Sequence, residues 1–180
     1  MQVDSPSQEP LQSSASPAPS APRRAEEQAP LVTLCFSTSV QSVHRLYSSN
    51  LSEEKNELRY GVAAMALHGH TYNFELKFRG PVYKSTGQVG GSNVLEEMAG
   101  LAIHEVLSNK NLDVDISFFL SRPSTLENVC LFIWRNITVI SAPHPFDICE
   151  VSVESTPCPR AGIFTTKQRV SFSGDMIALP

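Results

Sequence analysis

The sequence predicts an α+β fold in which helices cover one face of an antiparallel sheet. Three observations predict it. Residues 32–44, 68–79 and 148–154 alternate apolar and polar side chains with the period of a β-strand. Apolar residues at 92–107 and 124–137 recur instead at helical spacing. The resulting order of strands, helix, helix and strand is typical of helices gathered on one face of such a sheet.

The chain of 180 residues is expected to hold one globular domain with unstructured ends. Residues 1–30 are rich in Ser, Pro, Ala and Gln and have no hydrophobic period. Such a segment cannot bury enough apolar surface to offset the entropy lost on ordering, so we expect a disordered tail. The domain is expected to span residues 31–168, and residues 169–180 to form a C-terminal tail.

The connections of the first half follow from polarity and turn signals. Residues 48–59 are polar and are predicted to form a loop before the second strand. After that strand, Gly80-Pro81 and Ser85-Thr86-Gly87 are turn signals. They favour a hairpin partner near residues 88–91.

The helices carry start signals of different strength. Asn93 followed by Glu96 is a passable N-terminal cap for the segment 92–107. Ser124-Thr-Leu-Glu127 is a clearer capping box for the second helix. The apolar stripe of that helix consists of Leu126, Val129, Cys130, Ile133 and Ile137.

Charge and composition exclude several partners. The formal net charge is −4 and no block of Lys and Arg occurs, so nucleic acid and anionic membrane surfaces are not expected partners. No apolar run approaches the roughly 20 residues of a membrane helix. Without a signal pattern the protein is expected in the cytoplasm, with reduced thiols. The cysteines, which form no CxxC pair, are Cys35, Cys130, Cys149 and Cys158.

Histidines mark the ends of two predicted strands. His44 ends the first, while His68 and His70 share one face at the start of the second. If these strands are antiparallel neighbours, the three imidazoles meet at one end of the sheet. Three neutral imidazoles suit Zn²⁺ with an open fourth position, as in catalytic sites. The alternative is ordinary surface or hydrogen-bonded core histidines, and the residues alone leave both interpretations open.

Short motifs along the domain resemble those of one known family. They are His44-Arg-Leu, His68-Gly-His70, Leu107-Ser-Asn-Lys-Asn-Leu-Asp113, Ser124-Thr-Leu-Glu127-Asn and Val153-Glu154-Ser. In this order they resemble the 6-pyruvoyl-tetrahydropterin synthase family, which includes the bacterial 6-carboxy-tetrahydropterin synthases. The resemblance runs from about Val32 to Phe164.

The resemblance implies a tunnelling fold, a cofactor and a substrate. Each subunit would supply a four-stranded antiparallel sheet with two helices on one face. Subunits would assemble into a barrel, as a trimer or a hexamer of stacked trimers, with active sites between them. Zinc would bind His44, His68 and His70. The family's substrate is 7,8-dihydroneopterin triphosphate, from which triphosphate is eliminated in tetrahydropterin biosynthesis.

The resemblance also assigns the pterin pocket. The glutamate that holds the amidine-like edge of the pterin maps onto Glu154, and Thr125 and Glu127 contribute to the same pocket. From the residues alone, Glu154 also fits a solvated carboxylate at a strand end. Ser124 and Glu127 likewise have a sufficient role as a helix cap.

The proton-transfer residues of the family do not carry over. Val62, Ala63 and Ala64 occupy the window in which the family places its catalytic cysteine. The Asp-His pair that relays protons is replaced by Ser108 and Asn109. These side chains do not titrate near pH 7. The catalytic residues of this chain are therefore unknown from its sequence.

Three functions follow from this pattern. The first is an enzyme of the pterin synthase type with a substitute base, for which Cys158, Glu53, Glu54 and Glu57 are candidates. The second is a catalytically degenerate paralogue that binds zinc and a pterin as a binding or subunit-modulating protein. It would assemble with itself or with a paralogous subunit. The third is a different elimination or hydrolysis on a related pterin.

Overall fold

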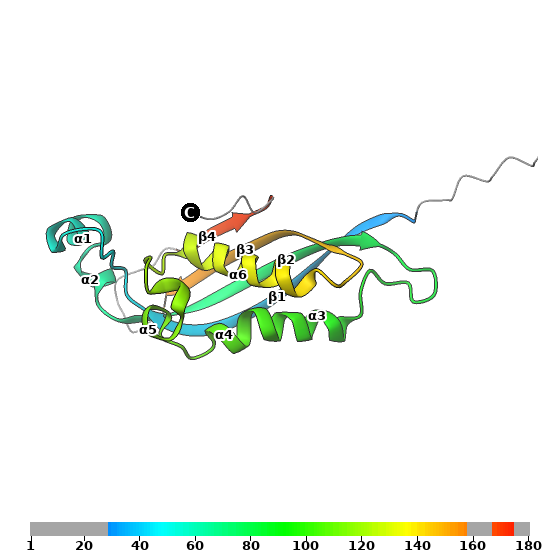
Figure 1. The fold of residues 1–180 in the computed structure, drawn as a ribbon, viewed down its shortest axis with the longest axis horizontal. Helices are drawn as coiled ribbons and strands as arrows, with labels where there is room; N and C mark the ends of the chain where they lie inside the picture. Colours follow the sequence, from blue (N-terminus) through cyan, green and yellow to red (C-terminus); the bar gives the residue numbers. More distant parts are fainter. Residues whose placement is uncertain (1–28, 158–166, 175–180) are drawn as a thin grey trace, which may run out of the picture.

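The computed structural model describes residues 29–157 and 167–174 of the chain. One antiparallel sheet forms its centre, with the strands side by side in chain order (Figure 1). They are β1 (Leu31–His44), β2 (His68–Pro81), β3 (Asp147–Pro157) and β4 (Gln168–Phe172). β1 and β2 pair along their full length, and this ladder ends with His44 opposite His68. The predicted four-stranded antiparallel sheet is confirmed.

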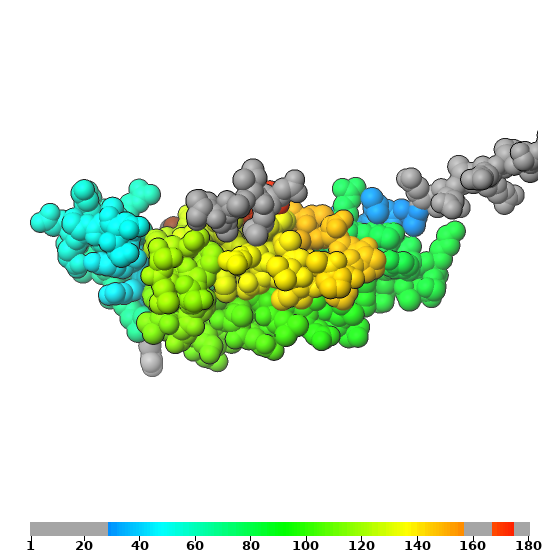
Figure 2. All heavy atoms as spheres, viewed as in Figure 1, coloured from blue at the N-terminus to red at the C-terminus, as the bar shows by residue number. Residues whose placement is uncertain are grey.

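Two long helical segments lie on one face of the sheet (Figure 1). The first is α3 (Ser92–Ala99), which continues through a π-helical turn (Gly100–His104) into α4 (Glu105–Leu107). The second is α6 (Leu126–Ser141). Figure 2 shows α6, in yellow, beside α3 and α4, in green. The connection between them contains α5 (Leu112–Asp115) and a 3-10 turn (Ser117–Phe119).

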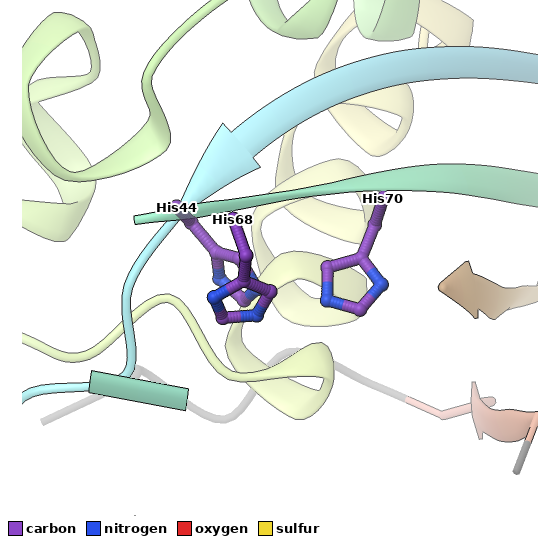
Figure 3. Close-up of side chains that lie close together, drawn as sticks. All are labelled: His44, His68 and His70. Atoms are coloured by element: carbon purple, nitrogen blue, oxygen red, sulfur yellow. The ribbon is translucent and has the colours of Figure 1, made fainter. Parts of the chain in front are cut away.

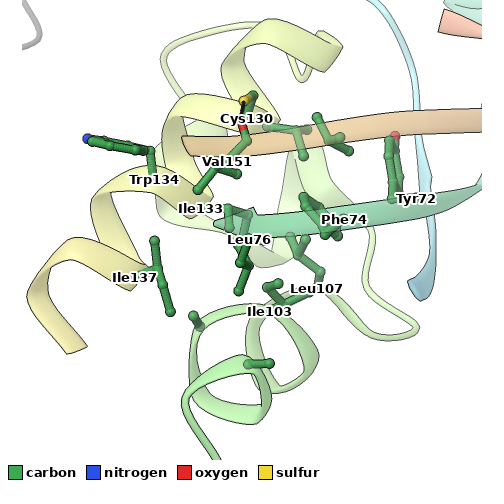
Figure 4. Packing of buried hydrophobic residues seen from close by; sticks show 14 of the residues in the cluster. Tyr72, Phe74, Leu76, Ile103, Leu107, Cys130, Ile133, Trp134, Ile137 and Val151 are labelled. Atoms are coloured by element: carbon green, nitrogen blue, oxygen red, sulfur yellow. Dashed lines mark hydrogen bonds between the residues drawn. The ribbon is translucent and has the colours of Figure 1, made fainter. Parts of the chain in front are cut away.

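The core forms where one face of β2 meets these helices (Figure 4). Alternate residues from Tyr72 to Phe78 are at most 1 % exposed. Burying each large apolar side chain is worth roughly 1.5–3 kcal/mol, and a one-residue slip would expose them all. This burial therefore fixes the register of β2. Because His68 and His70 share the same parity, it also fixes both histidines on the face that the helices cover.

Residues 48–59 are not the loop that the sequence predicts, because they contain α1 (Glu53–Tyr60), followed by α2 (Val62–Met65). The Ser52 hydroxyl caps α1 by accepting from the Lys55 N–H group. Gly61 ends α1 at φ +79°, which favours glycine. The only buried residue of α1 is Asn56, so no apolar stripe announces this helix in the sequence.

The ends of other elements also differ from the prediction. The hairpin partner predicted near 88–91 is wrong, because this segment forms no strand and Val89 packs into the core. The fourth strand is β4 instead, which continues the sheet past residue 168, where the domain was expected to end. The cap of α3 is Gly91 rather than Asn93. No helix in the described part of the chain is long and apolar enough to cross a membrane.

Candidate metal site

The structure brings together the three histidines at one end of the β1–β2 ladder (Figure 3). Their ring centroids are 4.7 Å apart for His44 and His68, 5.1 Å for His44 and His70, and 4.9 Å for His68 and His70. One ring nitrogen of each lies within 4.8 Å of those of the other two. Within residues 29–157 and 167–174, this is the cluster of His, Cys, Asp and Glu side chains that could hold a metal ion.

Hydrogen bonds fix which ring nitrogens carry protons. His44 Nδ1 lies 2.9 Å from the Ser124 carbonyl oxygen, and His68 Nδ1 lies 2.8 Å from the Ala66 carbonyl oxygen. A carbonyl oxygen only accepts, so each Nδ1 donates and each neutral ring keeps the lone pair on Nε2. His44 Nε2 and His70 Nδ1 are buried with no hydrogen-bond partner among the described residues. Buried polar atoms without partners are unfavourable, and a bound metal ion would satisfy them.

The electrostatics keep His44 and His70 neutral. Burial lowers the pKa of His44 to about 3, with smaller contributions in the same direction from His68 and His70. The hydrogen bond with the Ser124 backbone opposes this shift. Burial and the neighbouring His68 also lower the pKa of His70. Neutral imidazole is the form that binds a metal, so the residues present fit Zn²⁺.

The lowered pKa of His44 predicts acid sensitivity of the metal-free protein. Its pKa is 6.5 without the fold and about 3 within it. Between pH 6.5 and about pH 3, His44 is therefore protonated in the unfolded chain and neutral in the folded chain. Stability present above pH 6.5 is expected to fall toward pH 3, by at most about 1.4 kcal/mol per pH unit. Denaturant unfolding with chelator present, from pH 7.5 to 4.5, measures this slope. His44→Asn should flatten it, and an unchanged slope in that variant would contradict the assignment.

A cavity of about 600 Å³ opens beside the histidines. It lies between the ends of β1 and β2, helices α1 and α2, the start of α6, and strands β3 and β4. Its lining residues are His44, Leu46, Arg59, Tyr60, Ala64, His68, His70, Tyr72, Thr125, Leu126, Glu127, Ser155 and Gln168. The histidine cluster therefore faces a space large enough for a small molecule.

The structure places some of the predicted pterin-binding residues in this cavity. Thr125 and Glu127, at the start of α6, line it. Glu154 does not: it lies on the opposite face of β3, pairs with Lys167 at 3.2 Å and borders a separate depression on the open face. Ser155, the next residue, lines the cavity instead. The alternation of β3 predicts this, because Ser155 shares the parity of the buried Val153.

The structure also shows the residues that replace the family's proton-transfer groups. Ala64 is buried and lines the cavity, whereas Val62 is exposed and does not. Ser108 and Asn109 lie outside the lining, and the Asn109 N–H donates to the Gln41 carbonyl oxygen at the β1 edge.

None of the three candidate glutamates lines the cavity. Glu53, Glu54 and Glu57 are exposed on α1. Cys158 lies outside the described residues. The remaining cysteines, Cys35, Cys130 and Cys149, are free thiols, as predicted.

Ser124 has a role that the sequence analysis missed. The cap of α6 is Thr125, whose hydroxyl accepts from the Asn128 N–H group, so the predicted Ser124 cap is wrong. The Ser124 side chain is fully buried against His44 instead, with its hydroxyl 3.0 Å from Nδ1.

An antiparallel sheet with helices on one face, and three histidines beside a cavity at one end, defines a tunnelling-fold protein with a candidate metal site. The family model for 6-pyruvoyl tetrahydropterin synthase matches residues 33–164. The chain belongs to this family.

Individual relatives agree with this assignment. A 6-pyruvoyl tetrahydrobiopterin synthase of Drosophila melanogaster is 35% identical over 131 residues, which cover 72% of this chain and 77% of the relative. The human protein of the same name is 37% identical over 100 residues, or 55% of this chain and 69% of the relative. The structure of Caenorhabditis elegans 6-pyruvoyl tetrahydropterin synthase superimposes with a TM-score of 0.69 at 27% identity. It covers 82% of this chain and 99% of that one.

Proposed function

We propose that this chain binds Zn²⁺ and takes 7,8-dihydroneopterin triphosphate into the cavity, as a 6-pyruvoyl-tetrahydropterin synthase type of protein. One observation carries the proposal: three ring nitrogens converge within 4.8 Å at the wall of a cavity of about 600 Å³. Family membership and the name of its relatives, 6-pyruvoyl tetrahydrobiopterin synthase, support the choice of substrate.

His44, His68 and His70 would hold the metal ion at the wall of the cavity. When bound there, zinc lowers the pKa of a substrate hydroxyl and makes the adjacent C–H protons easier to remove. His44 and His70 stay neutral without it, so neither ring needs to release a proton when the ion binds.

Two carboxylates, Glu127 and Glu154, are candidates to bind the amidine-like edge of the pterin. A carboxylate can accept two parallel hydrogen bonds from such an edge. Glu127 lines the cavity within one chain, and Glu154 does not. We therefore propose Glu127, with Thr125 beside it, as the pterin contact of a single subunit. Glu154 would serve a pterin site only where subunits assemble around the open face of the sheet, as in a trimer or hexamer.

The cavity offers little general base chemistry. A positioned acid or base contributes roughly 10²–10⁴-fold to a rate. Val62, Ala63 and Ala64 occupy the window of the family's cysteine, and the one that lines the cavity, Ala64, offers only a methyl group. Slow turnover follows from this replacement. The same observation favours a second candidate function, in which the chain binds zinc and the pterin without turnover and modulates an intact paralogous subunit.

The test is the incubation of zinc-loaded protein with 7,8-dihydroneopterin triphosphate. Released triphosphate and bound pterin are both measured, with His68→Ala as the control. Zinc-dependent release that the control abolishes establishes an enzyme. Pterin that binds and is recovered unchanged establishes the binding function. Neither binding nor release in a zinc-loaded protein would refute both candidates.

Arg59 is expected to contact the triphosphate. It is the cation of the cavity lining, and its guanidinium makes no ion pair with the described residues. A hydrogen bond to a charged group is worth about 1.5–3 kcal/mol, and the low end suits this exposed side chain. Arg59→Gln should therefore weaken triphosphate binding about 10-fold and leave binding of dephosphorylated 7,8-dihydroneopterin unchanged.

Lys55→Gln is the matched control for this measurement by calorimetry. Lys55 lies one turn earlier on α1 and does not line the cavity. Its substitution by Gln removes one positive charge, as Arg59→Gln does. An equal loss of affinity in both variants would show a general effect of charge and contradict a contact by Arg59.

A further inference from the structure

A chain of hydrogen bonds leads from the buried His44 to a carboxylate outside the cavity. Ser124 presents both its carbonyl oxygen, at 2.9 Å, and its hydroxyl oxygen, at 3.0 Å, to His44 Nδ1. The Ser124 hydroxyl also lies 2.6 Å from Asp113 Oδ1. The other carboxylate oxygen of Asp113 accepts from the Arg45 N–H group at 2.7 Å. His44 and Ser124 are 5% and 0% exposed.

The direction of each bond in this chain is determined. The carboxylate of Asp113 only accepts, so the Ser124 hydroxyl donates its single proton to it. The hydroxyl oxygen can then only accept from His44. The carbonyl oxygen of Ser124 likewise accepts. Both atoms therefore require the proton of His44 on Nδ1 and leave the lone pair on Nε2, which faces the other histidines.

The chain also fixes where His44 lies. Arg45 follows the end of β1, Asp113 belongs to α5, and Ser124 precedes the first turn of α6. Asp113 thus accepts one hydrogen bond from the residue after β1, which carries His44, and one from Ser124, which contacts the His44 ring. Capping does not explain this arrangement, because Thr125 already caps α6 and Asn111 caps α5.

We propose that Asp113 is a positioning residue of the metal site, which acts through Ser124 to hold the His44 ring and its Nδ1–H tautomer. The inference rests on the proposed zinc site. Outer-shell partners of this kind typically change metal affinity by 10–100-fold when removed. The sequence places Asp113 at the end of a family-like motif but does not connect it with His44, which stands 69 positions away. Asp113 also lies outside the cavity lining.

The test is the zinc affinity of the full chain, measured by competition with a chromophoric chelator. Ser124→Ala and Asp113→Asn are each expected to weaken zinc binding by about 10-fold or more. Asp115→Asn is the matched control. Its carboxylate lies on the same helix and also accepts a backbone N–H, from Asn111, but does not contact Ser124. It should leave the affinity unchanged.

A double variant separates positioning from general support of the fold. If Asp113 acts through Ser124, Asp113→Asn has little further effect on affinity in the Ser124→Ala background. Independent effects of the two substitutions would overturn the proposal, as would single variants that match Asp115→Asn. The absorption spectrum of bound Co²⁺ gives a second readout, which should shift in both single variants. Absence of zinc binding by the wild-type chain would refute the proposed metal site itself. This outcome is distinct from failure of the Asp113 proposal, in which the wild-type chain binds zinc.

Discussion

Replacing His68 by alanine is expected to lower the affinity for zinc by more than about 100-fold. Loss of an outer-shell partner already costs 10–100-fold, and His68 supplies one of only three nitrogens of the proposed site. The half-buried ring stands at the start of β2, so the core below it should remain intact. Titration against a chromophoric chelator measures the affinity directly. Thermal unfolding gives a second measure, because an ion that binds only the folded chain raises its stability.

His144→Ala is the matched control for this substitution. His144 is also half-buried, but its ring stacks on Phe146, at 5.4 Å between centroids, near the opposite end of β2. This variant should bind zinc and gain thermal stability from it like the wild type. Equal zinc affinity in His68→Ala and in the wild type would remove the basis of the metal site.

The period-two pattern predicted the histidine cluster because the same pattern controls burial. Along β2, the parity of His68 and His70 is that of Tyr72 and the fully buried residues after it. Pairing with β1 then placed His44 opposite His68. Core packing therefore defines the geometry of the three rings, and a reader of the sequence needs only the correct pairing of two strands.

Other features depend on contacts that no local pattern reveals. Ser124 and Thr125 are both good helix caps, and a shift of one position decides which of them caps α6. The residue not used, Ser124, is then available to His44. Helix α1 is anchored by Asn56, whose side-chain oxygen accepts from the Ser48 N–H group at 2.8 Å. Such polar anchoring leaves no hydrophobic stripe in the sequence.

The fourth strand was missed for a related reason. β4 has five residues and pairs only with β3, and most of its side chains are exposed. Short strands with little burial are stabilised by the neighbouring strand rather than by their own composition. Its first residue, Gln168, still lines the cavity. The cavity wall therefore includes the first residue of a strand whose other four residues were expected to belong to the C-terminal tail.

Placing a thiol at Ala64 is expected to raise the rate of triphosphate release about 100-fold. Ala64 is 2% exposed and lines the cavity beside the histidines. It is one of the three residues in the window where the family resemblance places a cysteine. A positioned base contributes 10²–10⁴-fold. The low end applies because the variant still has the neutral Ser108 and Asn109 in place of the family's Asp-His proton relay. Steady-state release of triphosphate by the zinc-loaded variant measures the gain, which should grow as pH rises toward the thiol pKa of about 8.5.

Ala63→Cys distinguishes a positioned base from an added thiol. Ala63 is the preceding residue of α2 and does not line the cavity, so its thiol should leave the rate unchanged. A gain confined to Ala64→Cys would show that the cavity still binds the substrate in a reactive orientation and that only the base has been lost. If Ala64→Cys binds zinc and pterin but gains no rate, the loss extends beyond the base. The binding function would then be the stronger candidate.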